Sequence, residues 1–288
     1  MAAFLLAFVA GAVSGAGTLQ LLSYYRSGRS AFIGHTCRVE APANLSALPG
    51  FCDLTLRTAR GLGIHAWYVP SRNRAAIVFL HGSRGNRSAL VPEAVALAAQ
   101  GFGVLLLDFP GHGESEGEVH WDADDRAALI AAIDHLSSRD DVEAARIGVY
   151  AFSMGGVIAA QVAPDEPRVA ALVLTAVPTS MSEVLRWQYR GRGVIQYAPV
   201  LLAFHRGGVQ LSFDVRAAVR RLAGRPLLLV SGDADTTVPI AMARELHAAA
   251  GPGVSLHVVS GAGHGGFLAI EPNFGAVIGA FFEQNLRS

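Results

Sequence analysis

A serine, two aspartates and a histidine follow apolar runs of the sequence, at positions where the packing of a core does not require a polar side chain. Ser153 lies between a strand-like run, ARIGVY, and a helical run, VIAAQVA, so it is either a helix N-cap or an exposed nucleophile. Asp233 and Asp235 follow PLLLVS, and His264 follows SLHVVS between glycines. Acyl transfer needs a hydroxyl, an imidazole that takes its proton and a carboxylate that orients the imidazole. The four positions therefore indicate serine-dependent acyl chemistry.

Short buried strands must bring these side chains together. The runs AAIVFL, GVLLLD, RIGVYA, AALVLTA, PLLLVS and SLHVVS are apolar at nearly every position, and segments with helical periodicity separate them. Such runs are typical of parallel strands covered on both faces. Before them, CDLTLRTAR and GIHAWYVP alternate and predict an antiparallel hairpin. We therefore expect an α/β fold, a mostly parallel sheet with helices on both faces, whose ligands bind beyond the carboxyl ends of the strands.

One connection is too long for the alternation of strands and helices. About forty residues, roughly 179–222, separate LVLTAVP from RPLLLVS. We predict that this insertion forms a short cap over the carboxyl edge of the sheet. The alternative is an ordinary helical insertion that packs its aromatic side chains into the core. Those aromatic residues are Trp187, Tyr189, Tyr197, Phe204 and Phe213.

From about Phe51 to its end the sequence resembles the α/β-hydrolase fold family of serine hydrolases, in its esterase, lipase and acylpeptidase-like branch. The family's Gly-x-Ser-x-Gly nucleophile turn is matched by residues 151–155, with Ala151 in place of the first glycine. That position must be small because strand and helix crowd there, and alanine is the smallest alternative. The resemblance implies that Ser153 is the nucleophile.

The same resemblance implies an oxyanion hole and several structural residues. HGSRGN looks like the family's oxyanion loop, so the backbone N–H groups of Ser83 and Met154 are the expected donors. His81 is then expected to order this loop rather than to act as a base. In LLLDFPGHGES, Asp108 and His112 correspond to positions that are usually structural.

The acid of the set has two candidates in GDADTTVP. The family pattern is Gly-x-x-Asp followed three residues later by Val-Pro, and Asp235 matches it. Asp233 is expected to order the turn through its own backbone, as aspartate often does. His264, in GAGHGGF, matches the family's histidine loop and is the expected base.

The predicted reaction is attack by Ser153 on a carboxylic ester, thioester or amide, followed by hydrolysis of the acyl-enzyme. An acyltransferase would use the same groups, and a catalytically silent module that binds a ligand or protein at a membrane would keep only the fold. Together with the apolar N-terminal segment, the aromatic insertion suggests a small-molecule substrate with an apolar acyl group, or a lipid-soluble ester.

Composition and motifs argue against several other classes. Basic and acidic residues both number 23, the formal charge is zero and the pI is about 7.2, so nothing favours a nucleic-acid partner. No His-Glu-x-x-His helix or dinucleotide-binding pattern is present. We therefore expect neither a metal nor a cofactor.

The N-terminal segment, 1–25, predicts a hydrophobic membrane helix. Residues 2–22 carry no charge, and as a helix they would extend roughly 30 Å, the thickness of the bilayer core. Arg26, Arg29 and Arg38 follow the segment, which favours a cytoplasmic catalytic domain. A cleaved signal peptide, and hence a secreted or periplasmic protein, is the alternative.

Residues 26–50 are predicted to link this segment to one hydrolase domain, 51–288. The two cysteines, Cys37 and Cys52, lie in or near the linker. In an oxidising compartment they could form a disulfide, whereas in the cytoplasm they would remain thiols. The sequence leaves that choice open, along with the oligomeric state.

Overall fold

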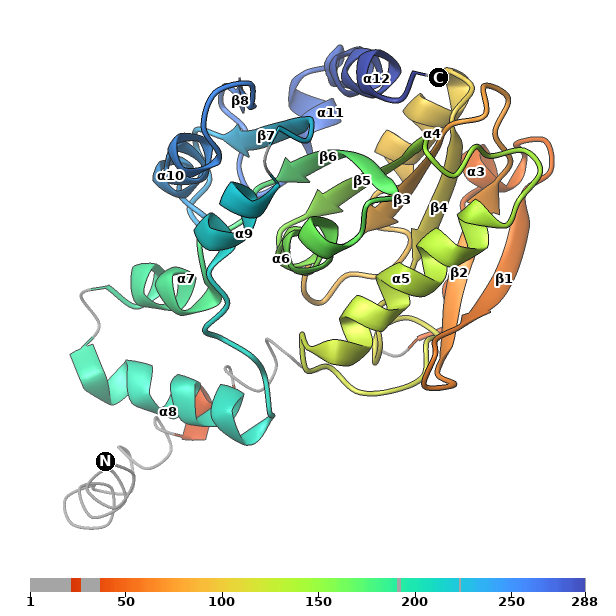
Figure 1. The fold of residues 1–288 in the computed structure, drawn as a ribbon. Helices are drawn as coiled ribbons and strands as arrows, with labels where there is room; N and C mark the ends of the chain where they lie inside the picture. Colours follow the sequence, from red (N-terminus) through yellow and green to blue (C-terminus); the bar gives the residue numbers. More distant parts are fainter. Residues whose placement is uncertain (1–21, 27–36, 191–192, 223, 288) are drawn as a thin grey trace.

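The computed structural model describes residues 22–26, 37–190, 193–222 and 224–287 (Figure 1). Within them, eight strands form one sheet in the order β1-β2-β4-β3-β5-β6-β7-β8. The strands are β1 (Cys52–Arg57), β2 (Gly63–Val69), β3 (Ala76–Leu80), β4 (Gly103–Leu107), β5 (Ile147–Phe152), β6 (Val169–Thr175), β7 (Leu227–Gly232) and β8 (Ser255–Val259). Strand β2 pairs antiparallel with β1 and β4, and all other neighbours are parallel. The predicted hairpin and parallel α/β sheet are therefore confirmed.

Helices cover both faces of this sheet. They are α3 (Ala43–Ser46), α4 (Val91–Ala99), α5 (Ala123–Ser137), α6 (Met154–Val162), the 3-10 helix η1 (Ala163–Asp165), α7 (Met181–Gln188), α8 (Gly193–Arg206), α9 (Val215–Arg221), α10 (Ile240–Ala250), α11 (Phe267–Ile270) and α12 (Phe274–Asn285). Helices α4 and α12 contact each other on one face, while α5, α6, α9 and α10 form a continuous layer on the other (Figure 1).

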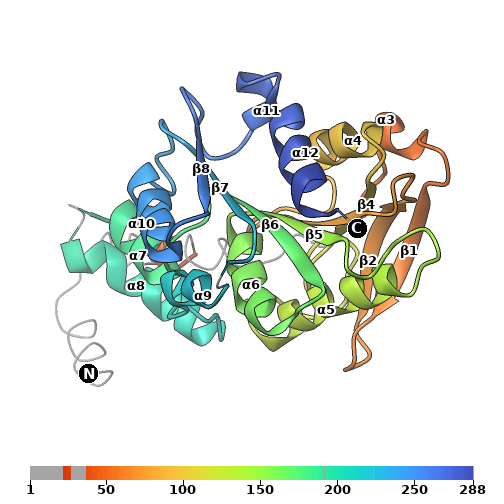
Figure 2. The same cartoon turned by 45° about the horizontal axis from the view of Figure 1, so that its top comes forward.

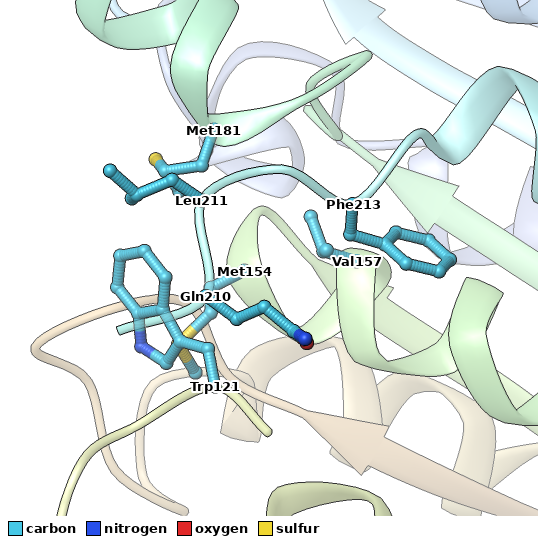
Figure 3. Close-up of a pocket in the computed structure, with 7 residues that line it drawn as sticks. All are labelled: Trp121, Met154, Val157, Met181, Gln210, Leu211 and Phe213. Atoms are coloured by element: carbon cyan, nitrogen blue, oxygen red, sulfur yellow. The ribbon is translucent and has the colours of Figure 1, made fainter. Parts of the chain in front are cut away.

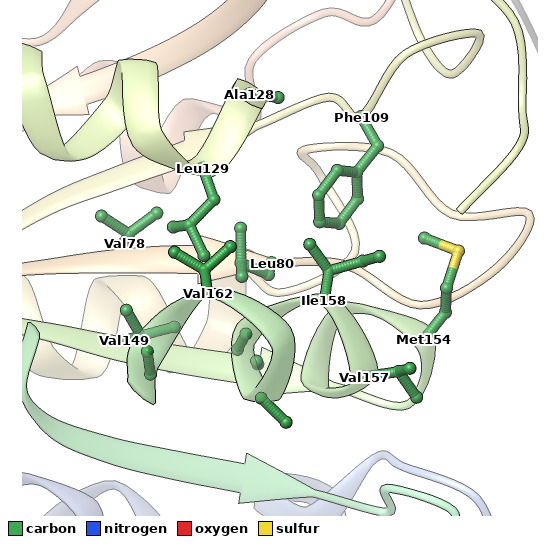
Figure 4. Packing of buried hydrophobic residues seen from close by; sticks show 14 of the residues in the cluster. Val78, Leu80, Phe109, Ala128, Leu129, Val149, Met154, Val157, Ile158 and Val162 are labelled. Carbon is green, nitrogen blue, oxygen red and sulfur yellow. The ribbon is translucent and has the colours of Figure 1, made fainter. Parts of the chain in front are cut away.

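The alternation of side chains along the strands divides the core into two clusters. In β3, Val78 and Leu80 point to the cluster under α5 and α6, whereas Phe79 belongs to the cluster under α4 and α12. Figure 4 shows the first cluster, in which Leu129 of α5 and Ile158 of α6 pack on the strands. Both faces of the central strands are buried, which is why their sequences are apolar at every position.

The insertion between β6 and β7 is helical and lies at the carboxyl edge of the sheet. Helices α7 and α8 lie beside each other in both ribbon views (Figures 1 and 2), and α9 packs on α6 and α10. The Trp187 indole N–H donates to the carbonyl of Thr236, in the loop after β7, at 3.2 Å. Phe204 is fully buried in the main core, whereas Tyr197 and Phe213 pack against it and remain half-exposed. The insertion is thus tied to the loop after β7 and contributes Phe204 to the core, while its role as a cap stays a prediction.

Most of the predicted N-terminal membrane helix lies outside the described residues. Residues 22–26 are helical, and Tyr24 and Tyr25 pack half-buried against the main core. In the described part of the chain, no helix has the length and hydrophobicity needed to cross a bilayer. Membrane anchoring by residues 2–22 therefore stays a prediction from the sequence. Cys37 and Cys52 are exposed free thiols in this structure.

Candidate active site

Ser153 occupies a sharp turn between β5 and α6. Its φ and ψ are 52° and −116°, a conformation that costs a residue with a side chain roughly 1–3 kcal/mol. The turn leaves no room on the helix side, because a β-carbon on Gly155 would lie 2.5 Å from the carbonyl oxygen of Leu80. A β-carbon on Gly156 would lie 2.1 Å from a methyl group of Val177. Ala151, by contrast, is accommodated in the buried end of β5, which explains why the first glycine of the motif is dispensable.

The hydroxyl of Ser153 does not cap α6 but faces a histidine. Its Oγ lies 3.1 Å from Nε2 of His264, whose Nδ1 lies 2.7 Å from Oδ2 of Asp235. In this arrangement Nδ1–H donates to the carboxylate, and Nε2 is free to accept the serine proton. The other oxygen of Asp235 accepts the N–H groups of Thr237 at 2.7 Å and Val238 at 2.9 Å. The Asp235 side chain is fully buried, while 23% of the His264 side chain is exposed to an incoming substrate.

Asp233 lies outside this hydrogen-bonded set. Its carboxylate accepts the N–H of Gly261 at 2.6 Å and the hydroxyl of Ser260 at 3.1 Å. The expectation that Asp233 orders its own turn is therefore wrong. Because β7 and β8 are neighbouring parallel strands, the loops after them meet, and Asp233 ties them together. Asp235 is the residue whose carboxylate bonds its own turn.

The loop after β3 approaches Ser153 closely. A β-carbon on Gly82 would lie 3.2 Å from Cβ of Ser153 and 2.8 Å from the ring of Phe152, so only glycine fits there. Ser83, the next residue, is exposed at this edge. The two amides predicted as oxyanion donors, those of Ser83 and Met154, thus belong to the residues that directly follow Gly82 and Ser153.

His81 has both ring nitrogens engaged within that loop. Nδ1–H donates to the carbonyl of Gly82 at 2.8 Å, and Nε2 accepts the N–H of Phe109 at 3.1 Å. Burial and, to a smaller extent, the neighbouring His112 lower the pKa of His81 to about 3. A neutral imidazole with both nitrogens occupied supports the loop and has no nitrogen left to act as a base.

A buried arginine that the sequence analysis did not single out fixes the same loop. The guanidinium of Arg87 is fully buried and pairs with the carboxylates of Asp108 and Glu114. It also donates to the carbonyl of Val39 at 3.2 Å and lies over the ring of Trp67 at 4.7 Å. One arginine in a loop makes no sequence pattern, and its partners come from distant segments. These contacts join the loop after β3 to the turn after β4.

The turn before α5 connects the core to the insertion. Trp121 is buried with a φ of 55°, and its ring centroid lies 5.9 Å from that of Phe204 in α8. The preceding residue, His120, accepts the N–H of Gln210 on its carbonyl at 3.1 Å. Its Nδ1 donates to the carbonyl of Gly207 at 3.0 Å. The loop between α8 and α9 is therefore held against the Trp121 turn.

A buried carboxyl group in the first turn of α5 should make stability depend on pH. Asp125 accepts the N–H of Asp122 on Oδ2, while Oδ1 is buried without a partner among the described residues. Burial raises the pKa of Asp125 from 3.8 to about 7. The folded state therefore holds a proton that the unfolded chain releases near pH 4, so the stabilisation from this group is lost as pH rises from about 4 to about 7.

We expect Asp125→Asn to remove that dependence. The difference in unfolding free energy between the variant and the natural protein should grow in favour of the variant by roughly 2 kcal/mol from pH 5 to pH 8. This corresponds to about 5 °C in melting temperature. Thermal unfolding of both proteins at the two pH values measures this difference. Asp134→Asn, which changes an exposed aspartate in the same helix, is the control and should leave the pH dependence in place. A difference between natural protein and Asp125→Asn that does not change with pH would show that Asp125 is ionised throughout.

The chain matches proteins of one family along most of its length. Residues 71–191 match the family model described as serine aminopeptidase, S33. The uncharacterised Mycobacterium tuberculosis protein Rv2307c is 33% identical over 231 residues, which cover 77% of this chain and 75% of that protein. The Arabidopsis thaliana α/β-hydrolase domain-containing protein WAV2 is 30% identical over 211 residues, 69% of this chain and 65% of WAV2. The chain belongs to the α/β-hydrolase family.

Solved structures show the same fold. The Pyrococcus furiosus esterase Pf2001 superposes with a TM-score of 0.76 at 20% identity, over 89% of this chain and 98% of that one. An esterase from Exiguobacterium antarcticum superposes with a TM-score of 0.62 at 18% identity, over 81% of this chain and all of that one. At these sequence identities the similarity shows a shared fold only, and the activity has to be argued from the residues of the site.

Proposed function

We propose that this protein is a serine hydrolase that cleaves carboxylic esters or thioesters through an acyl-enzyme. The observation that carries the proposal is the continuous hydrogen-bonded chain from Ser153 through His264 to buried Asp235, with the serine on a strained turn. Two of the similar solved structures are named esterases, which supports the same class of reaction.

In the first half of the proposed reaction, Ser153 attacks the substrate carbonyl while Nε2 of His264 takes the hydroxyl proton. The carbonyl oxygen becomes an oxyanion, which the amides of Ser83 and Met154 would stabilise. Collapse of the tetrahedral intermediate breaks the bond to the leaving oxygen or sulfur, and His264 returns the proton to that atom. Asp235 holds the imidazole in the tautomer that can accept at Nε2 and stabilises its charged form.

In the second half, water replaces the leaving group. His264 takes a proton from the water, the hydroxide attacks the acyl-enzyme, and Ser153 leaves with the proton restored to its oxygen. An acyltransferase would accept an alcohol or amine at this step, and nothing in the described site favours such an acceptor over water.

Rapid-mixing kinetics with p-nitrophenyl acetate tests the proposal. A burst of p-nitrophenol equal to the enzyme concentration, followed by slower turnover that releases acetate, is expected of an acyl-enzyme that water resolves. Adding a high concentration of an alcohol or amine distinguishes an acyltransferase, because product would then form with the acceptor at the expense of acetate. Absence of both burst and turnover in a folded sample would contradict the proposal and favour a binding module.

A further inference from the structure

A small apolar pocket lies between the core and the insertion, and its lining includes Met154, the residue after Ser153. Figure 3 shows the side chains that line it: Trp121, Met154, Val157, Met181, Gln210, Leu211 and Phe213. Met154 directly follows Ser153, and Val157 lies one turn further along α6. The pocket therefore starts at the residue whose amide is the proposed oxyanion donor.

The position of His264 decides which part of a substrate can enter the pocket. The imidazole lies against Phe152, with ring centroids 4.9 Å apart, whereas the pocket is lined by Met154 and by neither Phe152 nor His264. The leaving oxygen must lie near Nε2 of His264 to receive its proton. The leaving group therefore departs on the Phe152 side of Ser153, and the substituent on the Met154 side is the acyl chain.

The far wall of the pocket comes from the insertion and is held in place. Leu211 lies near Met181 and the ring of Trp121 in Figure 3, and its carbonyl accepts the N–H of Ser182 at 3.2 Å. Trp121 is fixed by its buried turn and by Phe204, whereas Leu211 and Met181 are half-buried. A chain that extends from the serine into the pocket would meet these three side chains.

We propose that this pocket binds the apolar acyl chain of the substrate and that Leu211, at its far wall, limits the length of that chain. The inference rests on the proposed serine hydrolase activity and adds to it a substrate class: esters of apolar carboxylic acids whose chain length Leu211 limits. Gln210 is exposed at the rim and adds no charge, so a carboxylate at the end of the chain finds no cation among the lining residues.

The test varies the acyl chain while the leaving group stays constant. The kcat/KM of the natural protein is measured for p-nitrophenyl acetate, butanoate, hexanoate and octanoate. It should rise from acetate, by up to roughly fourfold per methylene buried, and fall once the chain reaches Leu211. Leu211→Ala should raise the ratio of octanoate to butanoate by about tenfold, and Leu211→Trp should lower it by about tenfold. Leu202→Ala, an exposed leucine in α8, is the matched control and should leave the whole series unchanged.

A second series keeps the acyl group and lengthens the alcohol, from ethyl to octyl butanoate. The Leu211 variants should not alter its profile, because the alcohol lies on the Phe152 side. If they shift this series instead, the pocket binds the alcohol and the inference is wrong. Met181→Ala is a second variant that enlarges the pocket. The inference is equally wrong if Leu211→Ala and Met181→Ala both fold and neither changes the kcat/KM profile of either series.

Failure of the proposed function gives a different result. The natural protein would then hydrolyse no ester in either series and would not react at Ser153 with an organophosphonate, and the acyl-pocket inference would fall with it. An unchanged profile in an enzyme that does hydrolyse esters overturns the pocket inference alone.

Discussion

Replacing Ser153 with alanine is expected to lower kcat/KM for p-nitrophenyl esters by at least ten-thousandfold. The remaining groups can bind the substrate and polarise its carbonyl, but no oxygen is left to form the acyl-enzyme, and loss of such a nucleophile has a cost of this order. Steady-state kinetics over a range of enzyme concentrations measures the loss, with mass spectrometry to exclude reversion to serine.

The fold of the Ser153→Ala variant should be unaffected. Among the described residues the hydroxyl bonds only His264, and alanine can take the same turn at similar cost. The melting temperature should therefore change by no more than a few degrees. Ser255→Ala, an exposed serine at the start of β8, is the control for the substitution itself and should retain full activity. Retention of more than a tenth of the activity by folded Ser153→Ala would contradict the proposed mechanism.

The two aspartates after β7 give the second large prediction, because they are matched in type and lie two residues apart. Asp235→Asn should lower kcat by about ten-thousandfold, since an amide at this position favours the imidazole tautomer that cannot accept the serine proton. Asp233→Asn should cost less than about tenfold, because that carboxylate bonds Gly261 and Ser260 rather than the imidazole.

The same pair separates a catalytic effect from a structural one. Both variants are expected to fold, and Asp233→Asn, which weakens the tie between the loops after β7 and β8, should lose at least as much thermal stability as Asp235→Asn. The activities should therefore fall in the opposite order to any loss of stability. A larger loss of kcat in Asp233→Asn than in Asp235→Asn would show that the assignment of Asp235 as the acid is wrong.

Local sequence patterns predicted the sheet because each strand obeys a local rule. Runs such as AAIVFL in β3 are apolar at every position since both faces of the strand are covered, and the alternating β1 and β2 lie at the antiparallel edge of the sheet. The parallel topology then follows, because helices separate these strands. The same rule places residues that follow different parallel strands at one edge of the sheet, and for this reason the sequence alone groups Ser153, Asp235 and His264.

What the sequence did not predict depends on contacts between distant segments. Arg87 lies in the loop after β3, but its partners Asp108, Glu114 and Val39 lie 21 to 48 residues away. Likewise, Asp233 bonds the loop after β8 because strand order makes the two loops neighbours. The strained Trp121 turn carries no glycine or other residue that marks positive φ, so its role in the pocket emerged only from the fold.

Labelling of the purified protein with a fluorophosphonate tests the central claim most directly, because this reagent forms a stable adduct only with an activated serine. The natural protein and Ser153→Ala are treated in parallel, and the adduct is located by peptide mass spectrometry. A single adduct on Ser153, absent from the variant and reduced in Asp235→Asn but not in Asp233→Asn, is the predicted result. A folded natural protein that stays unlabelled, or that is labelled at another serine, would contradict the assignment of Ser153 as a nucleophile.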